Sequence, residues 1–262
     1  MASKDGGGDA SALKQRLIAR RIRLDDLAQC LRQGVADFMR APLYGLFFGG
    51  VYAVGGGLLV ALVFLLDLPY LAYPAAIGFA LIAPFACAGT YEVSRALERG
   101  RALTWSGVLG AVWRRAGKEL GWLSLVSLFT LIIWVDFAWT VFLSFYGLNV
   151  PPLRELATDI VTTPTGLLFF LVSNGIGALI AFLVFSITVV SPPLLVDRDI
   201  DFITAMTTSA RVVIANPLVM LVWAATIGTL LALSIATAFV GLFVVLPVLG
   251  HASWALYRRV VV

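Results

Sequence analysis

Long apolar runs constrain this chain more than any other feature of its sequence. The clearest is Leu120–Phe145, in which Asp136 is the one charged residue. About 20 apolar residues in a helix are enough to cross the hydrocarbon core of a bilayer. The whole chain is 60% hydrophobic and 13% charged, whereas soluble domains are about 45–50% apolar and about 25% charged. This excludes a soluble enzyme, a disordered chain and a disulfide scaffold, and it predicts an all-α, polytopic membrane protein.

The apolar runs predict six spans. Four runs have the length of one span each: Leu43–Leu66, Leu68–Tyr91, Leu120–Phe145 and Leu167–Val190. The last run, Leu218–Tyr257, has 40 residues and would reach about 60 Å as one helix, twice the thickness of the hydrocarbon core. We therefore expect it to fold back near Ala236–Gly241.

The basic residues predict the orientation of these spans. With six spans, 18 of the 19 Lys and Arg residues fall on the same side as both termini, and Arg154 falls on the other. Basic residues concentrate in cytoplasmic loops, so we expect both termini to be cytoplasmic and the loop of residues 146–166, with its short helix, to lie outside. Cys30 and Cys87 then lie on or near the cytoplasmic side, where a structural disulfide is not expected.

An amphipathic stretch precedes each pair of spans, which indicates an internal repeat. We expect residues 1–20 to form a flexible cytoplasmic tail and residues 21–262 one membrane domain with units at about 24–91, 104–190 and 199–258. The first and third units superpose at an offset of 175 residues, which places Pro42 on Pro217. The alternative is that any basic amphipathic segment before a span has this pattern.

Each unit is predicted to be a cytoplasmic amphipathic helix at the membrane interface, followed by a hairpin of two spans. Thr104 is the expected N-cap of the second amphipathic helix, and the acidic run Asp197, Asp199 and Asp201 leads into the third. The apolar faces are predicted to be Leu24, Leu27, Leu31, Val35 and Phe38; Trp105, Val108, Leu109, Val112, Trp113 and Ala116; and Phe202, Ile203, Met206, Ala210, Val213 and Ile214. The residues expected to face anionic lipid head groups are Arg32, Arg40, Arg114, Arg115, Lys118 and Arg211.

Two pairs of polar residues are candidates for function. Asp136 and Asn174 lie at depths that match within about 3 Å if both runs are helical, so a hydrogen bond between them is expected. Asp136 is either a protonated acid that locks two helices together or part of a proton or cation site. Glu92 and His251 lie at the inner ends of the second and sixth spans, where they could relay protons, although a local hydrogen bond of His251 is the favoured interpretation.

No motif for catalysis, metal binding or a cofactor occurs in the sequence. One histidine and two distant cysteines are too few for a recognisable metal site. Gly45 and Gly49, and the row of Ser173, Gly177 and Ala181, are interpreted as small residues that let helices pack closely. We therefore expect no enzyme activity, no metal and no cofactor.

Three segments resemble a bacterial family of uncharacterised integral membrane proteins, domain-of-unknown-function family 2189. They are Ala215-Asn216-Pro217, the run from Leu246 to Trp254, and the segment Asp37–Pro42. The resemblance implies a six-span protein of the bacterial inner membrane, and it brings no catalytic residues. Some relatives are labelled putative cytochrome c oxidase subunits. A single histidine, His251, cannot supply even a bis-histidine haem, so such a role would have to be an accessory one.

These observations favour a non-enzymatic accessory, assembly or membrane-organising protein. The expected partners are the bilayer, anionic lipids and a respiratory or envelope membrane complex, and no nucleic acid is expected. The alternative is a small-solute or ion transporter with Asp136 in its pathway.

Overall fold

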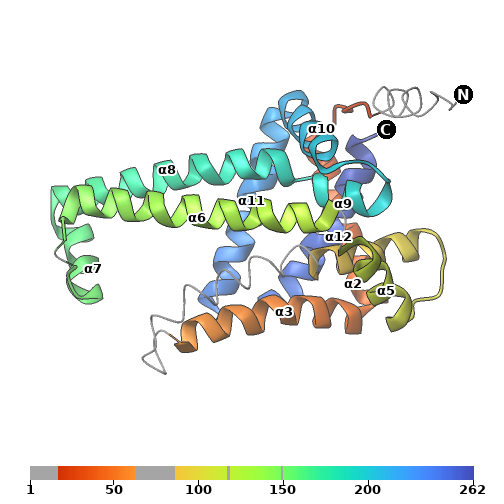
Figure 1. Ribbon diagram of the computed structural model, residues 1–262, viewed down its shortest axis with the longest axis horizontal. Coiled ribbons are helices and arrows are strands. Elements are labelled where there is room, and N and C mark those ends of the chain that lie inside the picture. Colours follow the sequence, from red (N-terminus) through yellow and green to blue (C-terminus); the bar gives the residue numbers. More distant parts are fainter. Residues whose placement is uncertain (1–16, 63–85, 117–118, 149) are drawn as a thin grey trace, which may run out of the picture.

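The computed structural model describes residues 17–62, 86–116, 119–148 and 150–262. Over these residues the predicted all-α fold is confirmed (Figure 1). In chain order the labelled helices are α2 (Leu24–Arg40), α3 (Pro42–Val60), α5 (Trp105–Ala116), α6 (Glu119–Tyr146), α7 (Leu153–Thr162), α8 (Pro164–Thr188), α9 (Ser191–Asp197), α10 (Phe202–Ala215), α11 (Pro217–Ala236) and α12 (Leu242–Val260). Residues 86–98 are also helical.

Four helices of the described part are long and apolar enough to cross a membrane. They are Pro42–Val60, Gly121–Tyr146, Pro164–Asp197 and Pro217–Ala236. These helices coincide with the first, third, fourth and fifth predicted spans. The second predicted span, Leu68–Tyr91, falls largely on residues 63–85, which lie outside the described residues. A multi-pass membrane protein is therefore supported, whereas the number six stays a prediction.

α6 and α8 form a long antiparallel hairpin that is closed by α7 (Figure 1). The side chain of Thr163 caps α8 by accepting a hydrogen bond from the Gly166 N–H at 2.9 Å. The Trp134 ring of α6 lies over Gly177 of α8, where an added Cβ would be 2.7 Å from the ring. Gly177 therefore lets the two helices pack closely, as predicted. α7 is the short helix expected in the loop of residues 146–166.

The last apolar run folds back where predicted. α11 ends at Ala236 and α12 begins at Leu242. The turn between them holds Ala238 at φ 52° and Phe239 at φ 68°, a left-handed conformation that costs a residue with a Cβ about 1–2 kcal/mol. The ring of Phe239 packs against Gly56 of α3, where an added Cβ would lie 2.5 Å from it. This contact anchors the strained turn.

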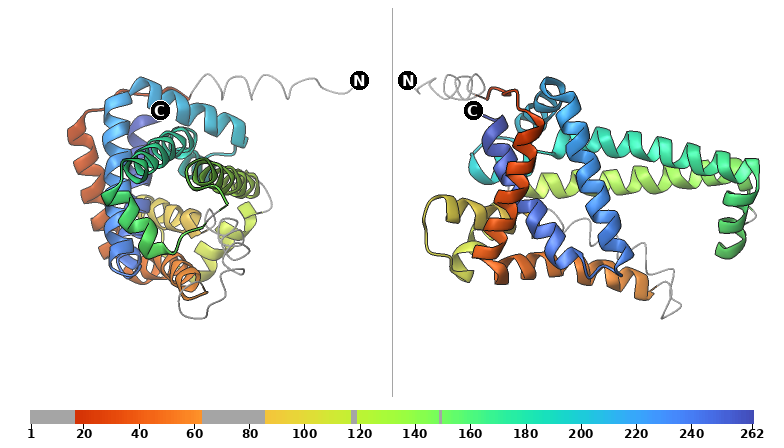
Figure 2. Two further views of the ribbon diagram at one scale, coloured as in Figure 1. Left: turned by 90° about the vertical axis from the view of Figure 1, so that its left-hand side faces the viewer. Right: turned by 180° about the vertical axis from the view of Figure 1, so that it is seen from behind.

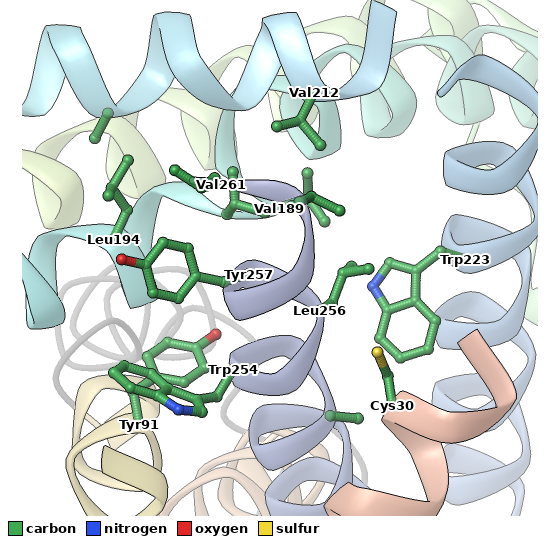
Figure 3. Close-up of a cluster of buried hydrophobic side chains, with 14 of the residues drawn as sticks. Cys30, Tyr91, Val189, Leu194, Val212, Trp223, Trp254, Leu256, Tyr257 and Val261 are labelled. Atoms are coloured by element: carbon green, nitrogen blue, oxygen red, sulfur yellow. The ribbon is translucent and has the colours of Figure 1, made fainter. Parts of the chain in front are cut away.

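α12 is the central helix of the core and is not one of the four candidate spans. Its second half is fully buried at Ala252, Leu256 and Tyr257. Figure 3 shows Tyr257 beside Leu194 on one side of α12, and Leu256 towards Trp223 and Cys30 on the other. α2, α3, α9 and α11 all pack on α12. This half also carries His251, Ser253, Arg258 and Arg259, which make it too polar for a lipid-facing span.

α12 packs closely against α2 and α3, and these two contacts fix its orientation. A Cβ at Gly34 of α2 would lie 2.5 Å from the Val248 carbonyl oxygen, and a Cβ at Gly49 of α3 would lie 2.8 Å from that of Phe243. The structure thus confirms the packing role of Gly49, with α12 as its neighbour. α11 and α12 cross the direction of α6 and α8 steeply (Figures 1 and 2). These two helices therefore do not run parallel to the α6–α8 hairpin, and the arrangement of three hairpins stays a prediction.

The helices predicted ahead of each hairpin exist as α2, α5 and α10, but their predicted faces are only partly right. Leu27, Val108 and Val213 are buried as expected. The exposed residues of the predicted faces include Leu24, Val35, Trp113, Ile203 and Ile214. Small residues explain the difference, because Gly34 and Cys30 of α2 and Ala205 and Ser209 of α10 form the buried contacts. Their placement in the head-group layer stays a prediction.

The expected tail boundary at residue 20 is wrong by a few residues. Leu17 is buried, and Ala19 pairs with Val261 in an antiparallel bridge. The Arg20 N–H donates to the Val260 carbonyl at 2.8 Å. Residues 17–20 are therefore attached to the end of α12, because this short extended segment satisfies backbone groups left free at the helix end.

Candidate functional site

Asp136 lies on the outer surface of the α6–α8 hairpin. Its side chain is exposed, as are Phe129 and Ile133 on the preceding turns of α6 and Thr140 on the next. Because the candidate span runs from Gly121 to Tyr146, Asp136 is about 4 Å from its middle at 1.5 Å per residue. An acid at this depth is unsolvated unless another protein group or water reaches it.

The expected hydrogen bond between Asp136 and Asn174 is not formed. The Asn174 side-chain amide donates to the Phe170 carbonyl of its own helix at 2.8 Å, and Asn174 is exposed. The expectation rested on matching depths along two helices. Depth does not specify rotation about each helix axis, and both side chains are exposed.

Asp197 is the centre of an ion-pair network at the other end of the hairpin. It ends α9, and its side chain is 8% exposed. Its carboxylate lies 3.1 Å from Arg99, 3.4 Å from Arg95 and 3.4 Å from Arg258. The Tyr257 hydroxyl donates to the same carboxylate at 2.9 Å. Asp197 therefore ties residues 86–98 to α9 and α12.

Two glutamates extend this network along residues 86–98. Glu92 is buried and lies 3.2 Å from Arg95 and 3.8 Å from Arg101. Glu98 accepts a hydrogen bond from the Trp254 indole at 2.9 Å and pairs with Arg258 at 2.9 Å. Acidic and basic side chains thus alternate where residues 86–98, α9 and α12 meet.

His251 forms a hydrogen bond with a residue that is distant in the sequence. It is fully buried, and its Nδ1 lies 2.6 Å from the Ser94 hydroxyl oxygen. Its Nε2 has no hydrogen-bond partner among the described residues. The hydrogen bond of His251 thus joins it to a residue 157 positions earlier in the chain rather than to its own helix end, and a relay between Glu92 and His251 stays a prediction.

A polar pocket of about 450 Å³ opens beside this network. It lies where α5, the start of α6, the end of α9 and the segment before α10 meet residues 86–101. Arg114 and Glu119 face it from α5 and α6. The residues that line it are Glu92, Arg95, Arg101, Ala111, Arg114, Glu119, Leu195, Asp197, Arg198, Asp199 and Ile200.

The six basic residues expected to face lipid have different positions. Arg32, Arg40, Arg114 and Arg211 are exposed, and Arg40 lies 3.8 Å from Asp37. Lys118 and the side chain of Arg115 lie outside the described residues. Arg114 lines the pocket, so it is the one of the four that combines exposure with a concave polar site.

The role of Asp197 was missed by sequence reasoning. Asp197, Asp199 and Asp201 were expected to lead into the third amphipathic helix, and Asp201 does cap α10 by accepting from the Thr204 N–H at 2.8 Å. Asp197 instead meets arginines 98 and 61 residues away in the chain. The weak signal available was the i, i+4 spacing of Arg95 and Arg99, which predicts one basic face but no partner.

Comparisons with known proteins agree with a membrane protein. Residues 72–197 match the family described as "Predicted integral membrane protein (DUF2189)". This segment contains Glu92, Asp136, Asn174 and Asp197, but not the motifs around Asn216 and Pro247 that first carried the resemblance. No curated protein and no solved structure matches the chain. The resemblance found in the sequence is confirmed: residues 72–197 of this chain match the model of the DUF2189 family of predicted integral membrane proteins.

Proposed function

We propose that this chain is a non-enzymatic accessory or assembly protein of the bacterial inner membrane, and that it binds a membrane-spanning helix of a partner protein at Asp136. The observation that carries the proposal is the exposure of Asp136 near the middle of a candidate span. An aspartate at the centre of a membrane helix costs about 2.5–3.5 kcal/mol. A partner that supplies a basic or hydrogen-bonding side chain at this depth would offset that cost.

The surroundings of Asp136 suit a helix as the partner. Phe129 is 63% exposed, Ile133 is 54% exposed and Trp139 is 50% exposed. In the most apolar part of the span that contains them, 6% of the residues are buried inside the protein, compared with 33% in Pro42–Val60. A second helix could therefore pack along α6 and bury both the apolar residues and the acid.

Charge complementarity favours a different protein over a second copy of this chain. The four candidate spans contain no Lys or Arg. A second copy would thus offer Asp136 another acid or a neutral polar group, whereas a span with Arg or Lys would form an ion pair. A subunit of a respiratory or envelope complex is the class of partner that we propose.

A transporter with Asp136 in its pathway is the alternative. It would require an enclosed or water-lined site between helices. The outward position of Asp136 and the separate hydrogen bond of Asn174 favour an interaction surface instead.

We also propose that both termini are cytoplasmic. α2, α5, α10 and the C-terminus lie towards one end of the α6–α8 hairpin, and α7 with Arg154 lies at the other (Figure 1). This arrangement agrees with the uneven distribution of Lys and Arg residues in the sequence and supports the proposed orientation.

The test is purification of the tagged full-length chain in mild detergent, with mass spectrometry of what accompanies it. We expect a stoichiometric membrane-protein partner with the wild type and its loss with Asp136→Ala. Glu155→Gln is the matched control, since Glu155 is an exposed acid of α7 outside the candidate spans. A partner-free wild type that gives a pH-dependent solute flux in liposomes, abolished by Asp136→Asn, would establish the transporter instead.

A further inference from the structure

We propose that the polar pocket beside Asp197 binds a phosphate group, and that Arg114 and Arg198 are the side chains that contact it. The pocket, at about 450 Å³, has the size of ordinary small-molecule sites, which are about 300–1,000 Å³. Arginine presents several N–H donors in a plane that matches phosphate oxygens. This site is independent of the proposed partner surface, because Glu119 and Asp136 are about 25 Å apart along α6 at 1.5 Å per residue.

Two of the four acids that line the pocket are already paired with arginines. Glu92 is shared by Arg95 and Arg101. Asp197 is shared by Arg95, Arg99 and Arg258. These two carboxylates therefore have arginine partners that do not include Arg114 or Arg198.

Arg114 and Arg198 are the pocket arginines that remain. Within the described residues neither forms an ion pair with an acid, although Arg198 contacts the Tyr257 hydroxyl. Glu119 is oriented by the Phe202 N–H, which donates to its carboxylate at 2.9 Å. Two guanidinium groups thus line a concave site and form no ion pair within the described residues, although the carboxylates of Glu119 and Asp199 line the same pocket.

The charge balance also favours an anion. Among the described residues, the pocket and the side chains ion-paired with it contain six arginines and five acids, a surplus of one positive charge. The set is Arg95, Arg99, Arg101, Arg114, Arg198 and Arg258 with Glu92, Glu98, Glu119, Asp197 and Asp199. A phosphodiester, which carries one negative charge, would neutralise this surplus.

The position of the pocket matches the depth of lipid head groups. Glu119 precedes the candidate span Gly121–Tyr146 by two residues, and Asp197 ends the candidate span Pro164–Asp197. Trp122 is 54% exposed and stacks on Phe202 with ring centroids 5.5 Å apart. Tryptophan is enriched at this level of membrane proteins. A lipid head group and a soluble phosphate compound can both reach such a site.

The experiment uses the full-length chain in dodecyl maltoside, which contains no phosphate, and measures the midpoint of thermal unfolding. The probes are dioctanoyl phosphatidylglycerol, inorganic phosphate and dioctanoylglycerol, which lacks the phosphate. The variants are Arg114→Gln with Arg198→Gln, and Arg32→Gln as the control for loss of an exposed charge on α2. Because neither pocket arginine forms an ion pair within the described residues, and a glutamine at 198 keeps a donor for the Tyr257 hydroxyl, we expect the ligand-free midpoint of the double variant to lie close to that of the wild type.

We expect phosphatidylglycerol to raise the midpoint of the wild type and of Arg32→Gln, and the double variant to bind it at least about tenfold more weakly. A shift with phosphatidylglycerol alone assigns the site to a lipid, and an equal shift with inorganic phosphate assigns it to a soluble phosphate compound. An equal shift with dioctanoylglycerol, or full binding by the double variant, would overturn the proposal. None of these outcomes depends on Asp136.

Discussion

Ala41 and Asn216 adopt the same backbone conformation 175 residues apart. Ala41 has φ −138° and ψ 54°, and Asn216 has φ −134° and ψ 50°. The N–H of Ala41 donates to the carbonyls of Asp37 and Phe38, and that of Asn216 donates to those of Val212 and Val213. A proline follows each residue and begins the next helix. This correspondence supports the proposed repeat between the first and third units.

The side chain of Asn216 adds a role that Ala41 does not have. Its Oδ1 accepts from the Ile22 N–H at 2.8 Å, and its Nδ2 donates to the Arg20 carbonyl at 3.0 Å. We expect Asn216→Ala to cost about 1–3 kcal/mol, because it leaves these backbone groups unpaired. Amide hydrogen exchange of residues 20–22 should become faster. Asn174→Ala, which removes an exposed side chain bonded to its own helix, should change stability by less than about 0.5 kcal/mol.

Gly34 permits the contact between α2 and α12. An added Cβ would lie 2.5 Å from the Val248 carbonyl oxygen and 2.9 Å from the Ala252 Cβ. We expect Gly34→Ala to lower the free energy of unfolding by about 1–3 kcal/mol through overpacking. Gly57→Ala is the matched control, since nothing lies within 4 Å of a Cβ there, and alanine should be neutral or stabilising by up to about 1 kcal/mol. Equal thermal midpoints for the two variants would contradict this packing.

Replacing Asp197 should lower the free energy of unfolding far more than replacing Arg99, one of the arginines that pair with it. Asp197→Asn removes the carboxylate shared by three arginines and leaves Arg95, whose side chain is 14% exposed, with Glu92 as its remaining acid, and breaking a buried ion pair costs about 3–5 kcal/mol. Arg99→Gln removes a side chain that is 47% exposed and should cost about 0–1 kcal/mol. Denaturant unfolding of the two variants gives the comparison, and similar losses would show that Asp197 is not the centre of the network.

Cys30 should resist alkylation in the folded protein. It is fully buried, and burial raises the pKa of its thiol to about 11, against the lowering effect of Arg259. In a Cys87→Ala background, maleimide should label Cys30 rapidly only after unfolding.

The same shift predicts how stability depends on pH. Burial raises the pKa of the thiol from its ordinary value of 9.0 to about 11, so the unfolded state, in which the thiol is solvated, loses its proton first. Stability should therefore fall by up to about 2–3 kcal/mol as pH rises from about 9 to about 11. Cys30→Ala should remove this part of the pH dependence, and an unchanged profile in that variant would assign it to other groups.

Local patterns predicted much of the secondary structure. Thr104 caps α5 by accepting from the Gly107 N–H at 3.1 Å, the proline at 217 begins α11, and α7 forms in the predicted loop. The break between Ala236 and Gly241 follows from bilayer thickness alone. Each of these features depends on residues that are neighbours in sequence.

Features set by tertiary packing could not be predicted in the same way. The buried face of α2 runs through Cys30 and Gly34, because α12 requires small residues there. Helical periodicity favoured Leu24 and Val35, which are both about half exposed. The exposure of Asp136 likewise depends on how α6 is rotated about its own axis. An estimate of depth along the helix gives no information about that rotation.

Site-specific photocrosslinking in intact membranes tests the partner surface most directly. A benzoylphenylalanine at Ile133, one turn from Asp136 and 54% exposed, is compared with one at Leu179 of α8, which is 60% exposed. We predict that the probe at Ile133 forms one discrete protein adduct, that Asp136→Ala abolishes it, and that the probe at Leu179 forms none. Lipid adducts alone at Ile133, or a protein adduct that persists in Asp136→Ala, would contradict the proposed function.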